Sequence, residues 1–283
     1  MLKSIFKTFG QALRKYQKFV VASLLTTVLT VSLAPQTAAA FNWAELLIQG
    51  IQVMQLSNVS DRDEVELGKQ INQQILQEVR ISRDPAANEL VKTIGQQLVP
   101  FSNRSNIPWT FQVVDDKNIN AFATMGGFVY VNTGTIASAD NRAQLAGVIG
   151  HEMGHITGRH ALEQLKQQAI AQGIASAVGA DRNILVGLGT EIALRLPRSR
   201  EDEFDADRRG LKTLTNAGFA PQALPAFMQK LAKGGGAMPE FLSTHPGAPE
   251  RVRALNEEIQ KNNLYGNGGL NDVNYQKKWR SRF

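Results

Sequence analysis

The chain contains no cysteine, and only four of its 283 residues are histidine. The absence of cysteine excludes disulfide bonds and lipid attachment through a cysteine. If such a chain is exported, its hydrophobic core must hold it together without the cross-links that are common in secreted proteins.

Most of the chain also lacks a charge excess. It has 31 basic and 25 acidic residues, but residues 1–40 hold five of the basic residues and no acidic one, so 41–283 is close to neutral. A nucleic-acid-binding domain needs a basic face in its folded part. No nucleic-acid partner is therefore expected.

Long apolar runs are scarce as well. The one candidate, FVVASLLTTVLTVSL, follows the basic stretch that ends at Lys18, and TAAAFNW comes after it. This order is typical of a secretory signal peptide, cut after Ala40. The alternative is an uncleaved anchor, but a spanning helix needs roughly 20 apolar residues. We predict a signal peptide at 1–40 and export to the periplasm or an equivalent extracytoplasmic compartment, with the product soluble or peripherally membrane-associated.

The mature part, 41–283, is long enough to bury one core, so a single domain is expected. Hydrophobic periodicity and capping residues predict mainly helices, and short β-branched and aromatic runs predict a small sheet, which gives an α+β fold that is mostly helical. The expected strands are 109–116 and 126–134. The expected helices are 60–81, 85–99, 141–160, 199–216, 221–233 and 249–261.

Three local features accompany this prediction. Asp140 is expected to cap the helix that begins near Asn141. Residues 162–196 are expected to form helical pieces interrupted at Gly179 and at Gly187–Gly189. Residues 265–283 are expected to be a flexible tail.

The stretch GHEMGHITGRH holds three of the four histidines. On an α-helix His151 and His155 lie one turn apart on the same face, as two ligands of a tetrahedral zinc ion do. Glu152 can then reach a metal-activated water as general base, which is why H-E-x-x-H is a metalloprotease motif. A solvent-exposed helix is the alternative, but the preceding apolar residues, Leu145, Val148 and Ile149, indicate a buried one.

Other residues of this stretch have different roles. His160 lies off the chelating pair, so it is expected either beside a ligand or at the surface. Gly147, Gly150 and Gly154 each lower helix propensity by roughly 1 kcal/mol relative to alanine. Such glycines are tolerable if another element approaches the helix closely.

A catalytic zinc ion needs a third protein ligand. Glu203 and Asp207 are four residues apart on a predicted helix, so Glu203 could bind the metal while Asp207 accepts a hydrogen bond from a ligand histidine. A solvated acidic helix face is the other interpretation, and spacing alone does not choose between the two. Three arginines support that second interpretation: Arg200, Arg208 and Arg209.

Together, HEMGH, SREDEFDAD and STHPGAPERVRAL resemble the gluzincin metallopeptidases that include the CAAX prenyl-protein endopeptidases, HtpX and the Oma-type mitochondrial proteases. The likeness is greatest to the soluble bacterial periplasmic branch and covers roughly 57–260. It implies a zincin-like domain with a small sheet ahead of the HExxH helix.

The resemblance also implies roles for individual residues. His151, His155 and Glu203 match the ligands of one Zn²⁺ per chain, and Glu152 matches the general base. Asp207 matches an aspartate that supports a ligand histidine and is assigned a proton-donor role. His245 matches a histidine near the metal, with two roles left open: oxyanion stabilisation, or occupation of the open zinc position at rest. A basic position after it matches Arg251 or Arg253.

Two regions depart from the family pattern or concern the substrate. Thr124-Met125 stands where relatives have Leu-Pro, which affects the expected shape of the substrate groove. Residues 162–196 are too short and too charged to span a membrane as in membrane-embedded relatives, so they are expected to be a core helix pair or a cover. An exposed strand edge is expected to bind extended substrates through the residues Gly127, Phe128, Val129, Tyr130 and Val131.

The sequence therefore predicts a zinc metalloendopeptidase that hydrolyses unfolded or misfolded envelope proteins. One alternative is a zinc-containing, chaperone-like protein that binds without cutting, although such a protein has no need of Glu152. Another is a membrane-surface protein that uses 162–196 and the tail Lys277–Phe283. No feature of the sequence selects a natural substrate or an oligomeric state.

Overall fold

The computed structural model describes residues 59–172, 182–234, 238–272 and 274–283. The predicted signal peptide at 1–40 and the predicted break at Gly179 lie outside these residues. No helix in the described ranges is long and apolar enough to span a bilayer.

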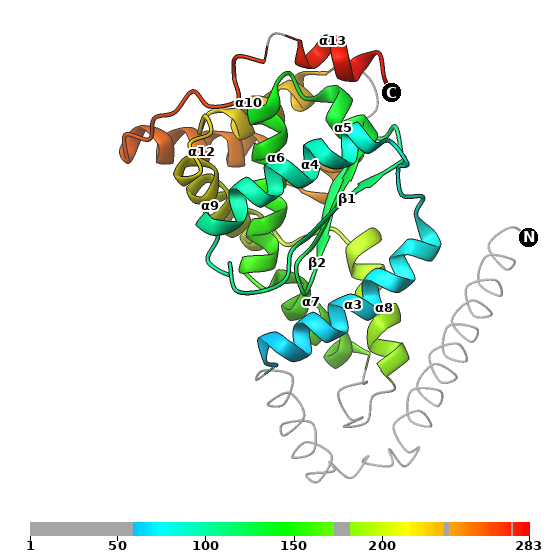
Figure 1. Cartoon of the computed structure of the whole chain (residues 1–283). Coiled ribbons are helices and arrows are strands. Elements are labelled where there is room, and N and C mark those ends of the chain that lie inside the picture. The colour runs from blue at the N-terminus through cyan, green and yellow to red at the C-terminus, as the bar shows by residue number, and fades with distance from the viewer. Residues whose placement is uncertain (1–58, 173–181, 235–237, 273) are drawn as a thin grey trace, which may run out of the picture. The chain divides into compact units, whose positions relative to one another are not determined.

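Helices dominate and one three-stranded sheet lies among them, so the predicted α+β class is confirmed (Figure 1). The strands are β1 (Thr110–Val114), β2 (Ala121–Thr124) and β3 (Phe128–Asn132). The helices before the motif are α3 (Asp61–Glu78), α4 (Pro85–Leu98), the short 3₁₀ helix η1 (Val99–Phe101) and α5 (Thr133–Ser138). The later helices are α6 (Arg142–Thr157), α7 (His160–Ala171), α8 (Arg182–Leu194), α9 (Arg200–Asn216), α10 (Ala223–Lys233), α11 (Glu240–Thr244), α12 (Ala248–Lys261) and α13 (Tyr275–Arg280).

Helix starts follow the capping residues. The Ser60 side chain accepts from the Asp63 N–H at the start of α3, and the Asp84 side chain accepts from the N–H groups of Ala86 and Ala87 at the start of α4. Ser199 caps α9 in the same way. The cap of α6 is Asn141, whose side chain accepts from the Gln144 N–H, so the prediction of Asp140 at that position is wrong by one residue.

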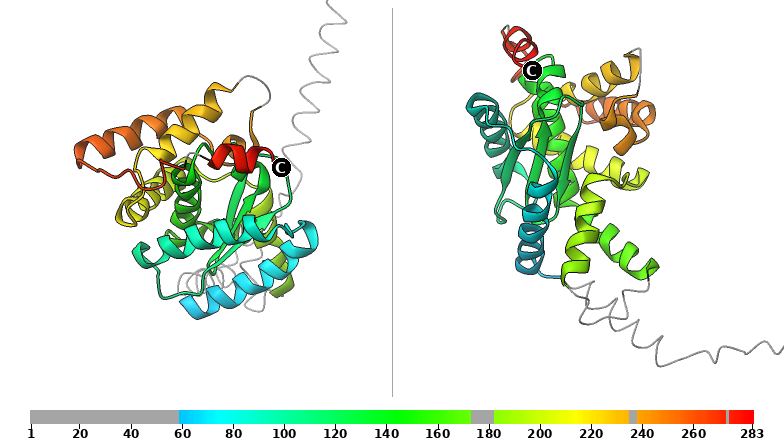
Figure 2. Two further views of the ribbon diagram at one scale, coloured as in Figure 1. Left: turned by 45° about the horizontal axis from the view of Figure 1, so that its top comes forward. Right: turned by 90° about the vertical axis from the view of Figure 1, so that its right-hand side faces the viewer.

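The strand order is β1-β3-β2, with β3 parallel to β1 and antiparallel to β2. Side chains alternate between the two faces of a strand, and both faces are buried here. Val129 and Val131 join one hydrophobic core with α4 and α6, whereas Phe128 and Tyr130 join a second core with α3, α7 and α8. The sheet therefore lies between two layers of helices (Figure 2).

Two further local predictions fail. Gly187 and Gly189 lie inside α8, which continues through them. In place of the expected flexible tail, α13 packs against the rest of the chain: Tyr275 and Trp279 are buried, and the Tyr275 hydroxyl donates to the Ile136 carbonyl at 3.0 Å. The tail is basic on one side and aromatic on the other, and its aromatic side packs against the rest of the chain.

Candidate metal and catalytic site

The close approach of α6 and α9 brings the predicted ligands together. The glycines of α6 make it possible, since a Cβ at Gly154 would lie 2.3 Å from the Ala206 carbonyl oxygen. Conversely, a Cβ at Gly210 would lie 2.8 Å from the Gly150 carbonyl oxygen. The expectation that another element approaches this helix is confirmed, and that element is the helix that carries Glu203.

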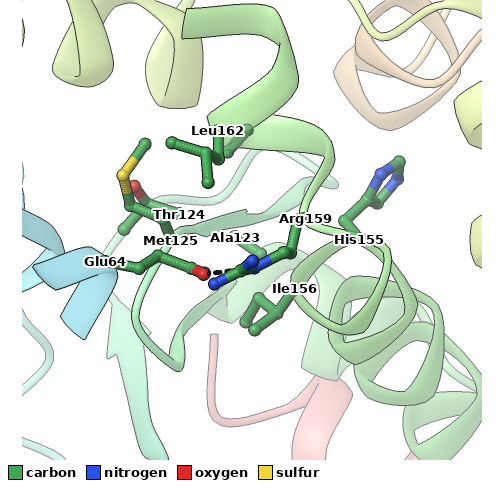
Figure 3. A pocket seen from close by; sticks show the side chains of 9 residues that line it. Glu64, Ala123, Thr124, Met125, His155, Ile156, Arg159 and Leu162 are labelled. Atoms are coloured by element: carbon green, nitrogen blue, oxygen red, sulfur yellow. Dashed lines mark hydrogen bonds and ion pairs between the residues drawn. The ribbon is translucent and has the colours of Figure 1, made fainter. Parts of the chain in front are cut away.

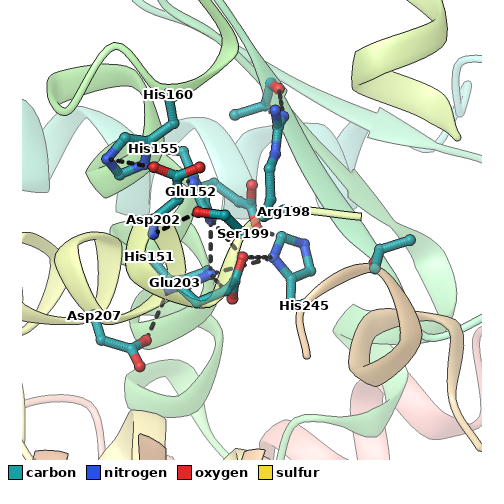
Figure 4. A network of polar contacts seen from close by, with 12 residues as sticks. His151, Glu152, His155, His160, Arg198, Ser199, Asp202, Glu203, Asp207 and His245 are labelled. Atoms are coloured by element: carbon teal, nitrogen blue, oxygen red, sulfur yellow. Dashed lines mark hydrogen bonds and ion pairs between the residues drawn. The ribbon is translucent and has the colours of Figure 1, made fainter. Parts of the chain in front are cut away.

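Four side chains converge between these helices and the segment after α11 (Figure 4). One ligand atom from each of His151, His155, Glu203 and His245 lies within 4.8 Å of the others, and all four side chains are buried. His151 Nε2 is 3.1 Å from His155 Nε2, and His155 Nε2 is 3.2 Å from Glu203 Oε1. His245 Nδ1 is 3.1 Å from Glu203 Oε1 and 3.4 Å from His151 Nε2.

These distances fit a zinc ion. Zinc binds imidazole nitrogen and carboxylate oxygen at about 2.0–2.1 Å with tetrahedral geometry, so neighbouring ligand atoms should lie about 3.3 Å apart. The separations given above, together with 3.5 Å between His151 Nε2 and Glu203 Oε2, run from 3.1 Å to 3.5 Å, and the full set of four ligand atoms lies within 4.8 Å. The donor set, imidazoles plus one carboxylate, is also one that zinc prefers.

The electrostatics of the cluster also favour a cation. Burial raises the pKa of Glu203, but the charges of His245 and His155 and the hydrogen bonds from His151 and His155 outweigh it. Together they lower the pKa of Glu203 well below its ordinary value. Burial raises the pKa of Asp207 too, but the hydrogen bond and charge of Arg251 outweigh it and lower that pKa. The buried carboxylates of Glu203 and Asp207 are thus both ionised, and the buried guanidinium of Arg251 contacts both of them.

Glu152 is buried directly beside the ligands. Among the described residues neither of its carboxylate oxygens has a hydrogen-bond partner, and His245 Nε2 lies 3.5 Å from its Oε1. A buried carboxylate is normally hydrogen-bonded, because an unpaired one is costly to desolvate. Glu152 is therefore available to accept a proton from a molecule that enters the site.

Each motif histidine has a different partner at its second ring nitrogen. His151 Nδ1 lies 2.9 Å from Asp207 Oδ1, which matches the predicted support of a ligand by that aspartate. His155 Nδ1 lies 2.9 Å from His160 Nδ1, so His160 is beside the predicted ligand His155, and it is buried and not a surface residue. Burial lowers the pKa of His155 well below its ordinary value. Burial and the charge of Arg251 also act to lower the pKa of His151, but its hydrogen bonds to Asp207 and Glu203 outweigh them and raise that pKa to about 9.

The alternative between Arg251 and Arg253 is resolved in favour of Arg251. Its guanidinium binds both oxygens of Asp207 at 2.7 Å, forms an ion pair with Glu203 and donates to the His245 carbonyl at 3.1 Å. Arg253 is exposed. The alternative of a solvated acidic face on α9 is wrong for Glu203 and Asp207, which are both buried.

The prediction of an exposed strand edge at Gly127–Val131 is wrong. Phe128–Val131 belong to β3, the central strand, and its backbone pairs on both sides. The strand next to the site is β2, which the sequence reasoning missed. Its Ala121 carbonyl lies 3.3 Å from His245 Nε2, and its Ala123 carbonyl accepts from Arg198 at 2.9 Å.

Arg198 was also missed. It is buried, it donates to Gln164 at 2.8 Å as well as to β2, and the charges of Glu152 and Glu203 act on it. Its only signal in the sequence is its place directly before the cap of α9, which does not distinguish it from the other arginines around it.

A narrow pocket lies on the far side of His155, between α7 and the β2–β3 turn (Figure 3). Leu162 and Met125 line it, and the ion pair between Glu64 and Arg159, at 2.7 Å, crosses one end. The pocket is too narrow to hold a water molecule. It is therefore not a substrate subsite in this conformation.

Comparison with known proteins connects this geometry to one family. The model for Peptidase family M48 matches residues 85–259, which include every predicted ligand and acid–base residue. The chain is 29% identical over 247 residues to the Beta-barrel assembly-enhancing protease of Escherichia coli strain K12, with 81% of this chain and 50% of that protein covered. It is 38% identical over 159 residues to the Mitochondrial metalloendopeptidase OMA1 of Arabidopsis thaliana, with 54% and 32% covered. The matched regions span half or less of the length of these relatives.

Proposed function

The chain belongs to peptidase family M48, and we propose that it is a zinc-dependent metalloendopeptidase that hydrolyses unfolded or misfolded envelope proteins. The observation that carries this proposal is the convergence of His151, His155 and Glu203 from two helices, with Glu152 beside them and, among the described residues, without a hydrogen-bond partner. A protein that only binds has no use for a buried carboxylate that is not hydrogen-bonded. Export is supported by the signal-peptide pattern of residues 1–40, and the proposal of envelope substrates draws on that pattern and on the name of the Escherichia coli relative, which refers to beta-barrel assembly.

We assign one zinc ion per chain to His151, His155 and Glu203. When bound, zinc lowers the pKa of a coordinated water to near neutrality and polarises the carbonyl that is attacked. Glu152 then takes the proton from the attacking water and delivers it to the leaving amine, as a general base followed by a general acid. Its freedom from hydrogen-bond partners supports this role.

Asp207 is proposed to orient His151. Its Oδ1 lies 2.9 Å from His151 Nδ1, and Arg251 holds both of its oxygens. A carboxylate held in this way fixes the tautomer of the ligand ring and raises its basicity. The proton-donor role that the family resemblance implies is less well supported, because an aspartate paired with a guanidinium stays ionised.

His245 is proposed to leave its present position when substrate enters. Its Nδ1 lies among the ligand atoms, where the attacking water has to bind. In the present position its Nε2 lies 3.5 Å from Glu152 Oε1 and 3.3 Å from the Ala121 carbonyl oxygen, and we propose that the displaced ring remains at this side of the site and donates to the developing oxyanion. His245 could thus have both roles expected from the sequence: it occupies the open zinc position before substrate binds and stabilises the oxyanion afterwards.

The substrate is proposed to add as a strand to β2, which replaces the prediction for Gly127–Val131. The carbonyls of Ala121 and Ala123 point away from β3 and accept from His245 and Arg198. A peptide N–H group can take the place of these donors. Backbone pairing recognises an extended chain more than its side chains, which favours unfolded substrates.

The decisive variant is Glu152→Gln, which keeps the shape of the side chain and removes its basicity. We expect it to retain one zinc ion per chain by metal analysis and to lose casein hydrolysis by about 100-fold or more. A chelator should abolish the wild-type activity. Undiminished casein cleavage by the variant would show that Glu152 is not the base. If the wild-type protein binds casein but never cuts it, with or without chelator, the chaperone-like alternative is correct.

A further inference from the structure

The ring of His155 makes contacts through both nitrogens. Nε2 faces His151 and Glu203 in the ligand cluster, at 3.1 Å and 3.2 Å. Nδ1 faces away from the cluster and lies 2.9 Å from Nδ1 of His160 (Figure 4). His160 Nε2 in turn lies 3.2 Å from Asp205 Oδ2. These contacts form a continuous chain from the ligand cluster to α9.

Metal binding fixes the protons along this chain. A metal-binding nitrogen carries no proton, so a neutral His155 that binds through Nε2 carries its proton on Nδ1. A contact of 2.9 Å between two ring nitrogens holds one proton, so His160 Nδ1 accepts it. A neutral His160 then carries its own proton on Nε2 and donates it to Asp205. Only one order of donors and acceptors satisfies all three groups.

Asp205 is fixed at the end of the chain. Arg209 and Arg208, on the same helix, both pair with it. Asp202 is the other carboxylate that faces His160, at 3.8 Å. Helix α9 therefore provides the ligand Glu203 and also the carboxylate that orients His155 through an intermediate ring.

We propose that His160 and Asp205 position the metal ligand His155, as Asp207 positions His151. This inference rests on the proposed metal site. The two arrangements differ in charge. Asp207 is a buried anion that needs Arg251, whereas His160 is a neutral acceptor that lets Asp205 stay about one-quarter exposed. A second buried aspartate at the position of His160 would add an uncompensated charge to a site that already holds Glu152 and Glu203.

A purely structural role for His160 is the alternative, since it is the first residue of α7 and its ring packs against Gly158. Two variants separate the roles. His160→Phe keeps a ring of similar size but offers no acceptor to His155. His160→Gln keeps an acceptor for His155 and a donor for Asp205. A positioning role predicts that glutamine restores what phenylalanine loses, and a packing role predicts the reverse.

The experiment measures zinc affinity by competition with a chromogenic chelator, and it does not depend on proteolysis. For His160→Phe we expect a 10- to 100-fold weaker zinc affinity, the range typical of partners of metal-bound histidines. For His160→Gln we expect recovery of most of that loss. The visible spectrum of the cobalt-substituted protein should shift in the phenylalanine variant and return with glutamine. Gln167→Ala, an exposed change on the same helix, serves as the control and should leave both readouts unchanged.

Asp205→Ala tests the far end of the chain without changing the core, in case His160→Phe fails to fold by circular dichroism. It should weaken zinc several-fold, while Glu201→Ala, which removes an exposed carboxylate of the same helix, should not. Wild-type zinc affinity in both Asp205→Ala and a folded His160→Phe would overturn the inference. Absence of zinc from the wild-type protein would instead overturn the proposed function.

Discussion

Arg251 is fully buried and contacts two carboxylates at once. It pairs with Glu203 and binds Asp207 through two nitrogens at 2.7 Å. Burial lowers the pKa of Arg251, but the hydrogen bond and charge of Asp207 and the charge of Glu203 outweigh it and raise that pKa. The guanidinium thus stays charged and offsets part of the negative charge next to the ligands.

We therefore expect Arg251→Leu to destabilise the fold strongly. Removing one partner of a buried ion pair leaves uncompensated charges and lowers the free energy of unfolding by about 3–5 kcal/mol. The control is Arg253→Leu, two residues further on the same helix but exposed, which should change stability by less than about 0.5 kcal/mol. Urea unfolding in the presence of a chelator measures both. Equal, small effects of the two substitutions would mean that Arg251 does not carry the charge balance of the site.

Residue spacing predicted part of this site. A helical i, i+4 pair fixes where His151 and His155 point whatever the rest of the fold, and the same rule applies to Glu203 and Asp207. Spacing could not choose between Arg251 and Arg253, since that depends on which face of α12 meets α9. Nor could it show that His160 contacts a ligand, because the left-handed residue Arg159 between α6 and α7 redirects the chain there.

At the scale of elements, the distance between α6 and α9 determines whether Glu203 reaches the histidines. Their backbones approach at Gly154, where an added Cβ would lie 2.3 Å from a backbone oxygen of Ala206. A backbone atom in a packed helix cannot move aside as a flexible side chain can. The helices would have to separate.

Gly154→Ala is accordingly expected to lower the free energy of unfolding by about 1–3 kcal/mol through overpacking and to weaken zinc affinity along with it. Gly187 is the matched control, because it is also within a helix but nothing lies within 4 Å of an added Cβ. Gly187→Ala should stabilise by up to about 1 kcal/mol through helix propensity. Thermal unfolding and chelator competition would follow both. Unchanged zinc affinity in Gly154→Ala would argue that helix separation does not control ligand convergence.

The helices were predicted better than the sheet. Long periodic segments with clear caps, such as α3, α4 and α9, match the expected ranges closely. Strand β2 was missed because it is four residues long and contains two alanines, a residue that is depleted in strands. Without it, β3 was predicted to be an edge strand, and the predicted substrate-binding residues Gly127–Val131 were assigned to what is the central strand.

At the scale of the whole molecule, the site depends on segments that are distant in sequence, around residues 151, 203 and 245. Contacts outside the site hold the helices that carry these segments in place. The tail makes some of these contacts, although it was expected to be flexible because glycines and charges surround it. Tyr275 and Trp279 nevertheless insert beside α5, and Arg282 pairs with Asp84 at the start of α4. Whether two aromatic residues find a groove is a tertiary property that composition does not contain.

Asp140 joins this tail to the elements around the motif helix. It pairs with Lys230 of α10 at 3.0 Å and accepts from Gln276 of α13 at 2.6 Å and from Gln144 of α6 at 3.1 Å. Burial raises the pKa of Asp140, but the hydrogen bond and charge of Lys230, together with the two glutamine contacts, outweigh it and lower that pKa below 3.8. The ionised carboxylate therefore stabilises the folded state more than the unfolded one.

The sign of the resulting pH dependence follows from linkage. A carboxyl whose pKa is lower in the folded state stabilises fully above its unfolded pKa and loses that contribution as the pH falls through the folded pKa. At about pH 6, Asp140→Asn should therefore be less stable than the wild type by about 1 kcal/mol, as expected for a partly exposed pair. This difference in stability should narrow as the pH falls below the ordinary value of 3.8 and should be lost once the pH has fallen through the lower pKa of the folded state. Urea unfolding across this pH range measures the difference in stability between the wild type and Asp140→Asn, with the exposed change Glu257→Gln as the control. A difference that stays constant with pH would mean that the charge of Asp140 does not hold the tail in place.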